Sequence, residues 1–322
     1  MAAATATTAT FAAYAGKAGT VYGDGSAGNY TAPGGETTLD VSNPQFNNFT
    51  VPAGRTLHVP SGLTIRCANT FTNAGTIIVD PAGGGTINID SNYFPIVSDV
   101  TRGIAKTAPY KVGVGRLGRG GRAVVANQVK AIFSVASEGG GTGFPSFDPS
   151  IRPSIFALGG GALHVLVQGA LTNTGTIHAL GQNGEPAIFN DTQSREAGGG
   201  SGGGVVILAS ATSLTQSGEV NVAGGIGGAD AGYGVSAFGP GGGGGGGLIR
   251  LLSPVIVSSG QNIVSKGAKQ QRLPGERQYN SGGGGGASAG DGAGYSESGA
   301  LEDAADGMVL IDQCSPTALL GN

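Results

Sequence analysis

The chain has 322 residues, of which 65 are glycine, and charged residues make up only 11% of it. An ordinary globular domain carries about 25% charged residues, so this composition favours a rigid exterior protein over an enzyme. The net charge of −3 argues against a nucleic-acid partner, and no run approaches the roughly 18 apolar residues that a membrane span requires.

Residues 1–20 are dominated by alanine and threonine and predict an extended N-terminal arm that docks onto a partner. The first residues lack the basic segment that opens a secretory signal, so we do not expect a signal peptide.

Residues 21–90 predict an N-terminal β domain. Its clearest strands cover 63–67 and 71–79, where apolar residues alternate with polar ones. Cys67 has the strand parity of Leu63 and Ile65, so it should pack inward as a small hydrophobe. His58 alternates with aliphatic residues and should point outward.

The sequence pattern of residues 91–158 differs from the segments before and after it and predicts an inserted subdomain or an oligomer contact. Residues 113–118 match the dinucleotide-binding pattern of three glycines. That pattern needs a strand before it, a helix after it and a downstream acidic residue, and no such context is evident. We therefore expect no cofactor.

Residues 159–322 predict a glycine-rich β-repeat domain. One unit covers 161–167 and 171–177, the next 204–208 and 214–220, and the third 247–252 and 256–264, while 307–311 begins a fourth. Leu171, Leu214 and Ile256 hold equivalent places, spaced by 43 and then 42 residues. The strands at 63–79 are an earlier copy, about 100 residues upstream.

Each unit reads as two short strands joined by a tight Asn/Ser-x-Gly turn. Strands this short cannot form a core alone, so the units should stack. The predicted fold class is all-β: a β-solenoid, β-helix-like or layered sandwich body, with polyproline-II-like glycine insertions projecting from one edge.

The glycine-rich segments cover roughly 181–204, 224–247 and 267–292. Ordering a glycine costs roughly 0.5–1 kcal/mol more than ordering an alanine, so order needs compensation. One hypothesis is a close-packed bundle cross-linked by backbone hydrogen bonds, and the other is disorder. Aromatic and arginine residues interrupt the tracts as candidate binding residues at their tips: Phe189, Arg195, Tyr233, Phe238, Arg272, Arg277, Tyr279 and Tyr295.

Neither a catalytic nor a metal site is predicted. Residues 286–290 match the pattern around a hydrolase serine, but they lie within a glycine tract. His164 and His178 should be outward surface histidines, and no cluster offers enough metal ligands. Sequence spacing does not exclude a carboxylate pair assembled from different units.

Two resemblances bear on function. Tyr-Gly-Asp-Gly-Ser at 22–26 and Phe/Leu-Thr-Asn-x-Gly-Thr-Ile at 71–77 and 171–177 resemble tailed-bacteriophage virion proteins, over roughly residues 20–90 and 159–313. The alternation of glycine runs with aromatic-bearing loops at 185–201, 229–243 and 268–305 resembles the distal tail-fibre adhesins of T-even-like phages. Those adhesins carry packed polyproline-II glycine domains with variable receptor-binding loops.

These resemblances imply a structural protein of the virion surface, made in the host cytoplasm, and specifically a tail fibre or receptor-binding adhesin. Its expected partners are other virion proteins, reached through the N-terminal arm, and a host glycan or outer-membrane protein. The low charge leaves surface for a homo-oligomer such as a trimer. The main alternative is a capsid-decoration or head-fibre protein, and a lyase or depolymerase and an ice-binding protein are further alternatives.

Overall fold

A computed structural model describes residues 21–39, 41, 44–81, 158–186, 197–229, 241–268 and 301–316, with short strands and a few positions between these ranges. The predicted N-terminal arm at 1–20 lies outside the described residues, as does most of the segment 91–158.

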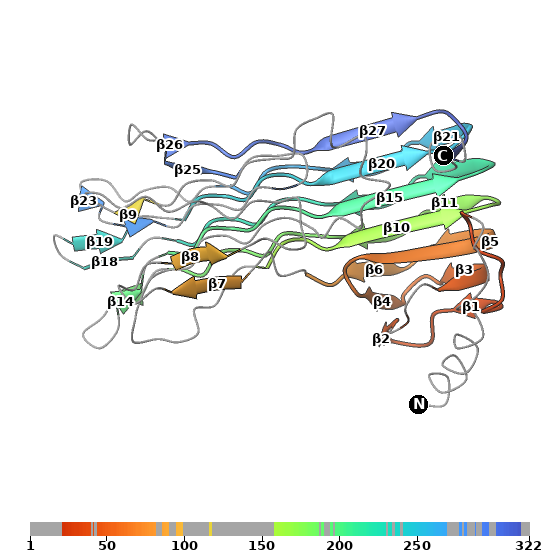
Figure 1. The fold of residues 1–322 in the computed structure, drawn as a ribbon, viewed down its shortest axis with the longest axis horizontal. Coiled ribbons are helices and arrows are strands. Elements are labelled where there is room, and N and C mark those ends of the chain that lie inside the picture. Colours follow the sequence, from red (N-terminus) through yellow and green to blue (C-terminus); the bar gives the residue numbers. More distant parts are fainter. Residues whose placement is uncertain are drawn as a thin grey trace.

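The larger sheet has ten strands, all paired in parallel (Figure 1). The long strand β5 pairs with β10 through its first half, with β11 through its last three residues and with β3 from Arg66 to Asn73, and the sheet curls into a half-barrel. The strand order is β21 (Val255–Ser258), β16 (Ser213–Gln216), β11 (Leu171–Asn173), β5 (Leu63–Asn73), β10 (Ala162–Val167), β15 (Val205–Ser210), β20 (Leu248–Leu252) and β27 (Met308–Asp312), with β3 (Gln45–Val51) beside β5 and β1 (Tyr30–Thr31) beside β3.

A second sheet of six parallel strands faces the first across a shared apolar core. Its order is β2 (Glu36–Thr38), β4 (Thr56–Val59), β6 (Thr76–Val79), β12 (Thr176–His178), β17 (Glu219–Asn221) and β22 (Gln261–Ile263). Phe49, Ile65 and Leu163 of the first sheet and Ile77 and Ile177 of the second belong to one buried cluster. Alternating inward residues therefore build the core, and Cys67 packs into it as predicted.

The predicted repeat register is confirmed. Leu171 pairs with Phe71 on one side and with Leu214 on the other, and Leu214 pairs with Ile256. A column of turn glycines follows the same register, because a Cβ on Gly218 would lie 1.9 Å from the carbonyl oxygen of Gly175. Successive units thus approach too closely at this turn for any residue with a side chain.

The predicted fold class was wrong. Parallel sheets of this kind are typical of α/β proteins, yet the described residues contain almost no helix. The architecture is a curled half-barrel sheet with a second parallel sheet, and it is not the predicted β-solenoid. The Asn-x-Gly turn does not close a hairpin: it carries the chain from β11 in one sheet to β12 in the other. The glycine segments also do not project as insertions from an edge, since they continue the strands in line (Figure 1).

Three central strands of the larger sheet are buried on both faces. Every residue of β10, β15 and β20 is buried, and Val205, Ile207 and Leu248 form a separate cluster on the face away from the main core. This double burial explains why these segments are mostly apolar, with His164 and Arg250 as the exceptions within β10 and β20.

Candidate functional site

Glycine-rich segments run side by side from the two sheets to the far end of the molecule (Figure 1). We call 179–186, 222–229 and 264–268 the outgoing segments, because each follows a strand of the second sheet. We call 197–204, 241–247 and 303–307 the returning segments, because each leads into β15, β20 or β27.

Backbone hydrogen bonds join these segments with a period of three residues. In the segment 222–229, the amides of Gly225 and Gly228 donate to the returning segment 197–204, both at 2.8 Å. The amides of Gly224 and Gly227 donate to the next outgoing segment, both at 3.0 Å. Three residues per turn is the repeat of a polyproline-II helix, whose backbone groups point outward to neighbours. The glycine tracts are therefore ordered and cross-linked by backbone hydrogen bonds in the described residues, as one of the two hypotheses predicted.

The glycines of this lattice are required by space. A Cβ would lie 2.0 Å from a backbone oxygen at Gly200, 1.8 Å at Gly225 and 1.9 Å at Gly244. None of the three has a φ in the left-handed region, so close approach is the reason for glycine here.

Side chains occur where the lattice meets solvent, with a period of three in the segment 222–229. Ile226 and Ala229 are the exposed residues of that segment, whereas Leu180, Gln182, Asn183, Glu185 and Pro186 are all exposed on its neighbour. Both returning segments 197–204 and 241–247 are buried throughout, and the second is glycine only. Sequence reasoning missed this pattern, although the spacing of non-glycine residues in 222–229 carries the signal.

The far end of the lattice carries short strands that include most of the predicted binding residues (Figure 1). β13 (Ile188–Phe189) pairs antiparallel with β14 (Ser194–Arg195), and β18 (Ala231–Tyr233) pairs antiparallel with β19 (Ser236–Phe238). β23 (Arg277–Gln278) lies parallel to β19, and β13 contacts β18. We call these strands the distal strands, together with β9 (Arg116–Leu117), β24 (Asn280–Ser281), β25 (Gly294–Tyr295) and β26 (Leu301–Glu302).

The structure thus gathers candidates from three separate glycine tracts at one end of the molecule. Phe189 and Arg195 lie on the first pair of strands, and Tyr233 and Phe238 on the second. Arg277 lies on β23, and Tyr295 lies on β25, which pairs with β26. Arg272 and Tyr279 lie outside the described residues.

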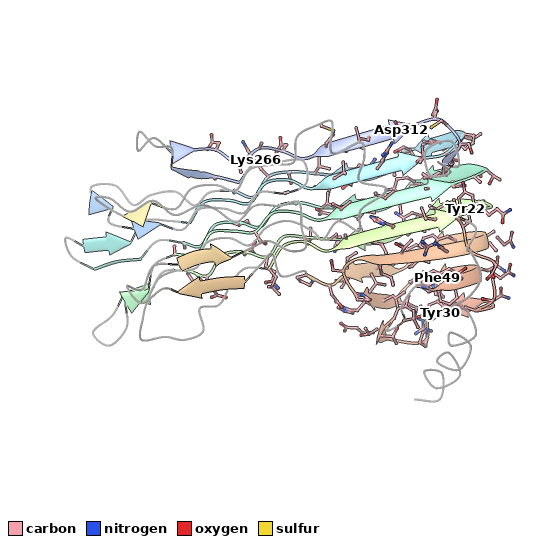
Figure 2. The ribbon with its side chains drawn as sticks, in the orientation of Figure 1. Tyr22, Tyr30, Phe49, Lys266 and Asp312 are labelled. Carbon is pink, nitrogen blue, oxygen red and sulfur yellow. The ribbon has the colours of Figure 1, made fainter. Side chains whose placement is uncertain are left out.

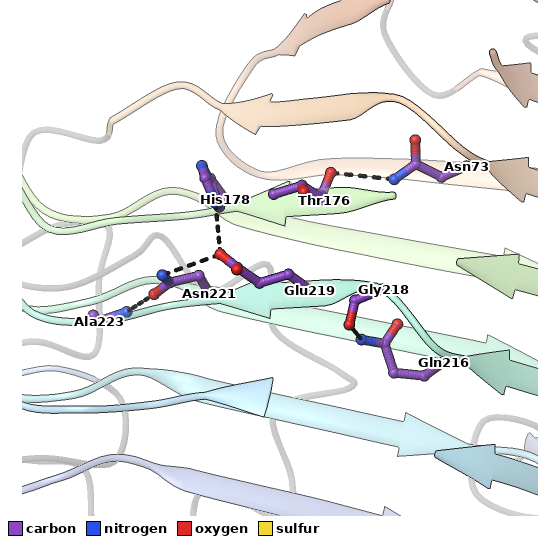
Figure 3. A network of polar contacts seen from close by, with 8 residues as sticks. All are labelled: Asn73, Thr176, His178, Gln216, Gly218, Glu219, Asn221 and Ala223. Atoms are coloured by element: carbon purple, nitrogen blue, oxygen red, sulfur yellow. Dashed lines mark hydrogen bonds and ion pairs between the residues drawn. The ribbon is translucent and has the colours of Figure 1, made fainter. Parts of the chain in front are cut away.

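Away from the distal strands, the outer face of the second sheet carries histidine–carboxylate contacts. His58 Nε2 lies 2.7 Å from Glu36 Oε1, and His58 Nδ1 lies 3.3 Å from Asp80 Oδ1. Burial opposes the charged imidazole, but the hydrogen bonds to Glu36 and Asp80 outweigh it, and the pKa of His58 is raised. In the next units, His178 Nε2 lies 2.9 Å from a Glu219 oxygen that also accepts from Asn221 (Figure 3).

The prediction that His164 is a surface histidine was wrong. It points away from the main core, but that face of β10 is also buried, and Nε2 has no hydrogen-bond partner among the described residues. Desolvation, with a smaller contribution from the nearby charge of Arg66, lowers the pKa of His164 to about 4. Such a neutral buried histidine is a packing residue of the sheet.

A buried amide ladder lies where the chain passes between the two sheets. Asn73 donates to the side chain of Asn173 at 2.7 Å, and Asn173 donates to Gln216 at 2.6 Å. Asn73 also donates to the carbonyl of Thr176, where β12 of the next unit begins, and Gln216 donates to the carbonyl of Gly218 in the turn after its own strand (Figure 3). The asparagines were visible in the sequence as turn residues, but their contact with one another was not.

The described part of the chain shows neither a cluster of metal ligands nor a membrane-spanning helix, and its buried cysteine is protonated. No three or more histidine, cysteine, aspartate or glutamate side chains come together there as metal ligands. Burial raises the pKa of the Cys67 thiol to about 12, which keeps it protonated, and Cys67 and Cys314 are both free thiols. None of the described helical structure has the length and hydrophobicity of a membrane-spanning helix.

Comparisons with protein families, with curated proteins and with solved structures found no match for this chain.

Proposed function

We propose that this protein is a receptor-binding adhesin on the surface of a tailed-phage virion, with its binding surface on the distal strands. The observation that carries the proposal is the glycine lattice. Buried, hydrogen-bonded segments connect an apolar two-sheet body to short strands at the far end, where aromatic and arginine residues of three repeat units gather.

The physical advantage of such a lattice is preorganisation. Binding through flexible loops costs roughly 0.5–1.5 kcal/mol for each side chain that becomes immobilised, and more for the backbone. Here the backbone leading to the distal strands is already held by hydrogen bonds such as those of Gly200 and Gly203 to the neighbouring returning segment, both 2.9 Å long. The segments leading to the distal strands are therefore already ordered before a receptor binds.

The residue types on the distal strands suit a host-surface ligand. A sugar ring stacks on phenylalanine or tyrosine, such as Phe189 or Tyr233, and a guanidinium such as that of Arg195 forms paired hydrogen bonds with hydroxyl or carboxylate groups. The sequence resemblance to tail-fibre adhesins with glycine-rich domains supports the same function. A host glycan or an outer-membrane protein remains the proposed receptor.

The test is direct binding of the purified, fluorescently labelled chain to a panel of candidate host bacteria. Two variants remove side chains from the distal strands: Phe189→Ala with Arg195→Ala, and Tyr233→Ala with Phe238→Ala. A control, Leu180→Ala, removes an exposed apolar side chain from the flank of the lattice. We expect saturable binding to one host, reduced at least about tenfold by one or both variants and unchanged in the control, with equal unfolding temperatures.

Saturable binding that survives both distal variants would place the receptor surface elsewhere. Absence of binding to every host, combined with saturable binding to phage capsids, would instead favour a decoration or head-fibre protein.

A further inference from the structure

The two sheets end differently along the stack of units. At the end formed by the earliest strands, Tyr30, Ala32 and Leu39 pack against the core, and the ring of Tyr30 stacks on Phe49 with centroids 4.7 Å apart. At the opposite end, β21, β22 and β27 each pair on one side only within the described residues. Figure 2 shows the two ends, with Tyr30 near one and Asp312 on the other. We call the second end the open edge.

The open edge exposes apolar side chains. Val255 is 55% exposed, Val257 is 54% exposed and Ile311 is 52% exposed, and these are the three most exposed of the large hydrophobic residues in the described part of the chain. Ile311 pairs in register with Leu251, which is fully buried in the core. Within the described residues, the fourth unit thus adds β27 to the larger sheet, and the core-facing side of β27 is partly exposed to solvent.

The open edge carries few of the features that normally keep strand edges apart, with the exception of the exposed Pro254 directly before β21. Natural edges carry lysines, prolines or bulges that oppose pairing with another chain. β21 and β22 contain no charged residue, and the one charge of β27, Asp312, is held by Arg250 Nε at 2.7 Å. At the opposite end the edge strands have two and three residues, and one of them carries the charge of Glu36.

We propose that the open edge is a self-association surface, occupied by the same edge of a second copy of this chain. Stacked repeats generally need a polar terminal unit to remain soluble alone, and the last strands here instead expose Val255, Val257 and Ile311. An uncharged edge meets its own copy without repulsion, and the exposed valines then face apolar groups. A charged partner would find no complementary charge on β21 or β22.

The mass of the full chain in solution tests this proposal, by light scattering after size exclusion over a range of concentrations. We expect a multiple of 31.3 kDa for the unaltered chain. The double variant Val255→Lys with Val257→Lys should fall to the monomer mass, because two charges oppose pairing at the centre of the edge. Ile226→Lys is the matched control: it adds a charge at another exposed apolar residue, and it should keep the oligomeric mass.

A monomeric mass for the unaltered chain at every concentration would overturn the proposal, as would an oligomer that survives the double variant. If the double variant fails to fold, hydrogen exchange on the unaltered chain decides. Amides of β21 and β27 should lose protection on dilution while those of β10 keep it, and protection at the edge that does not depend on concentration would count against self-association.

Discussion

Replacing Gly200 with alanine tests the lattice most directly, because a matched control lies two residues away. A Cβ on Gly200 would lie 2.0 Å from the carbonyl oxygen of Gly225, and 2.5 Å from its carbonyl carbon. A Cβ on Gly198, in the same returning segment, would have its closest contact at 3.1 Å, with the amide nitrogen of Glu185. Both changes add the same methyl group to buried glycine, so only the surrounding space differs.

The expected cost follows from what must move. The backbone of Gly225 has to shift by about 1 Å or more to reach an ordinary contact distance, and it donates to Ser201 and accepts from Gly244, both at 2.8 Å. Two or three weakened hydrogen bonds at about 1 kcal/mol each, with an overpacking cost of about 1–3 kcal/mol, give a loss of about 3–6 kcal/mol. For Gly198→Ala we expect less than about 1 kcal/mol, because restriction of the unfolded chain offsets a small steric cost.

The assay is thermal unfolding of the two variants and the unaltered chain, followed by circular dichroism at one protein concentration. At about 2 °C per kcal/mol for a chain of this size, Gly200→Ala should unfold about 6–12 °C lower, and Gly198→Ala within about 2 °C of the unaltered chain. Proteolysis should also cut the returning segment 197–204 faster in Gly200→Ala. Equal unfolding temperatures for the two variants would refute the argument that the lattice requires glycine at Gly200 for space.

Three further predictions concern side chains of the two sheets. The pKa of His164 is lowered to about 4, so the contribution of this residue to stability is present above its unfolded pKa of about 6.5 and is lost as the pH falls. The variant His164→Leu should therefore remove about 3 kcal/mol of acid destabilisation at about pH 4, measured by urea unfolding. Because the pKa of His58 is raised, the contribution of this residue to stability is fully present below about pH 6.5 and is lost as the pH rises through the folded pKa. The variant His58→Gln should therefore flatten the dependence of the unfolding temperature on pH between about pH 6 and about pH 8. An unchanged pH dependence would contradict the contacts of His58 with Glu36 and Asp80. Asn173→Leu should cost about 2–4 kcal/mol, because it leaves the buried oxygen of Gln216 without its donor, and adding Gln216→Leu should recover part of that loss in a double-mutant cycle.

The strand positions and their pairing register could be predicted from the sequence. Alternation with a period of two placed Cys67 and Ile65 inward, and the spacing of Leu171, Leu214 and Ile256 predicted which residues pair across units. Both signals are local or nearly so, because each depends on the side-chain period of a strand and on repetition of the same segment. One of two hypotheses also predicted that the glycine tracts are ordered, because ordering them needs compensation for the lost conformational entropy.

Only the tertiary structure decided how those strands are arranged. An Asn-x-Gly turn has the same residues whether it closes a hairpin or passes between sheets, so the curled half-barrel and the second sheet could not be predicted from Asn173 and Gly175 alone. His164 has the alternation of an exposed residue and is buried because the other face of β10 is covered too. The requirement for glycine at Gly200 depends on a carbonyl 25 residues away, and the gathering of Phe189, Arg195 and Tyr233 at one end depends on segments from different units lying side by side. Such long-range contacts have no local period in the sequence, because they depend on the packing of segments that are far apart along the chain.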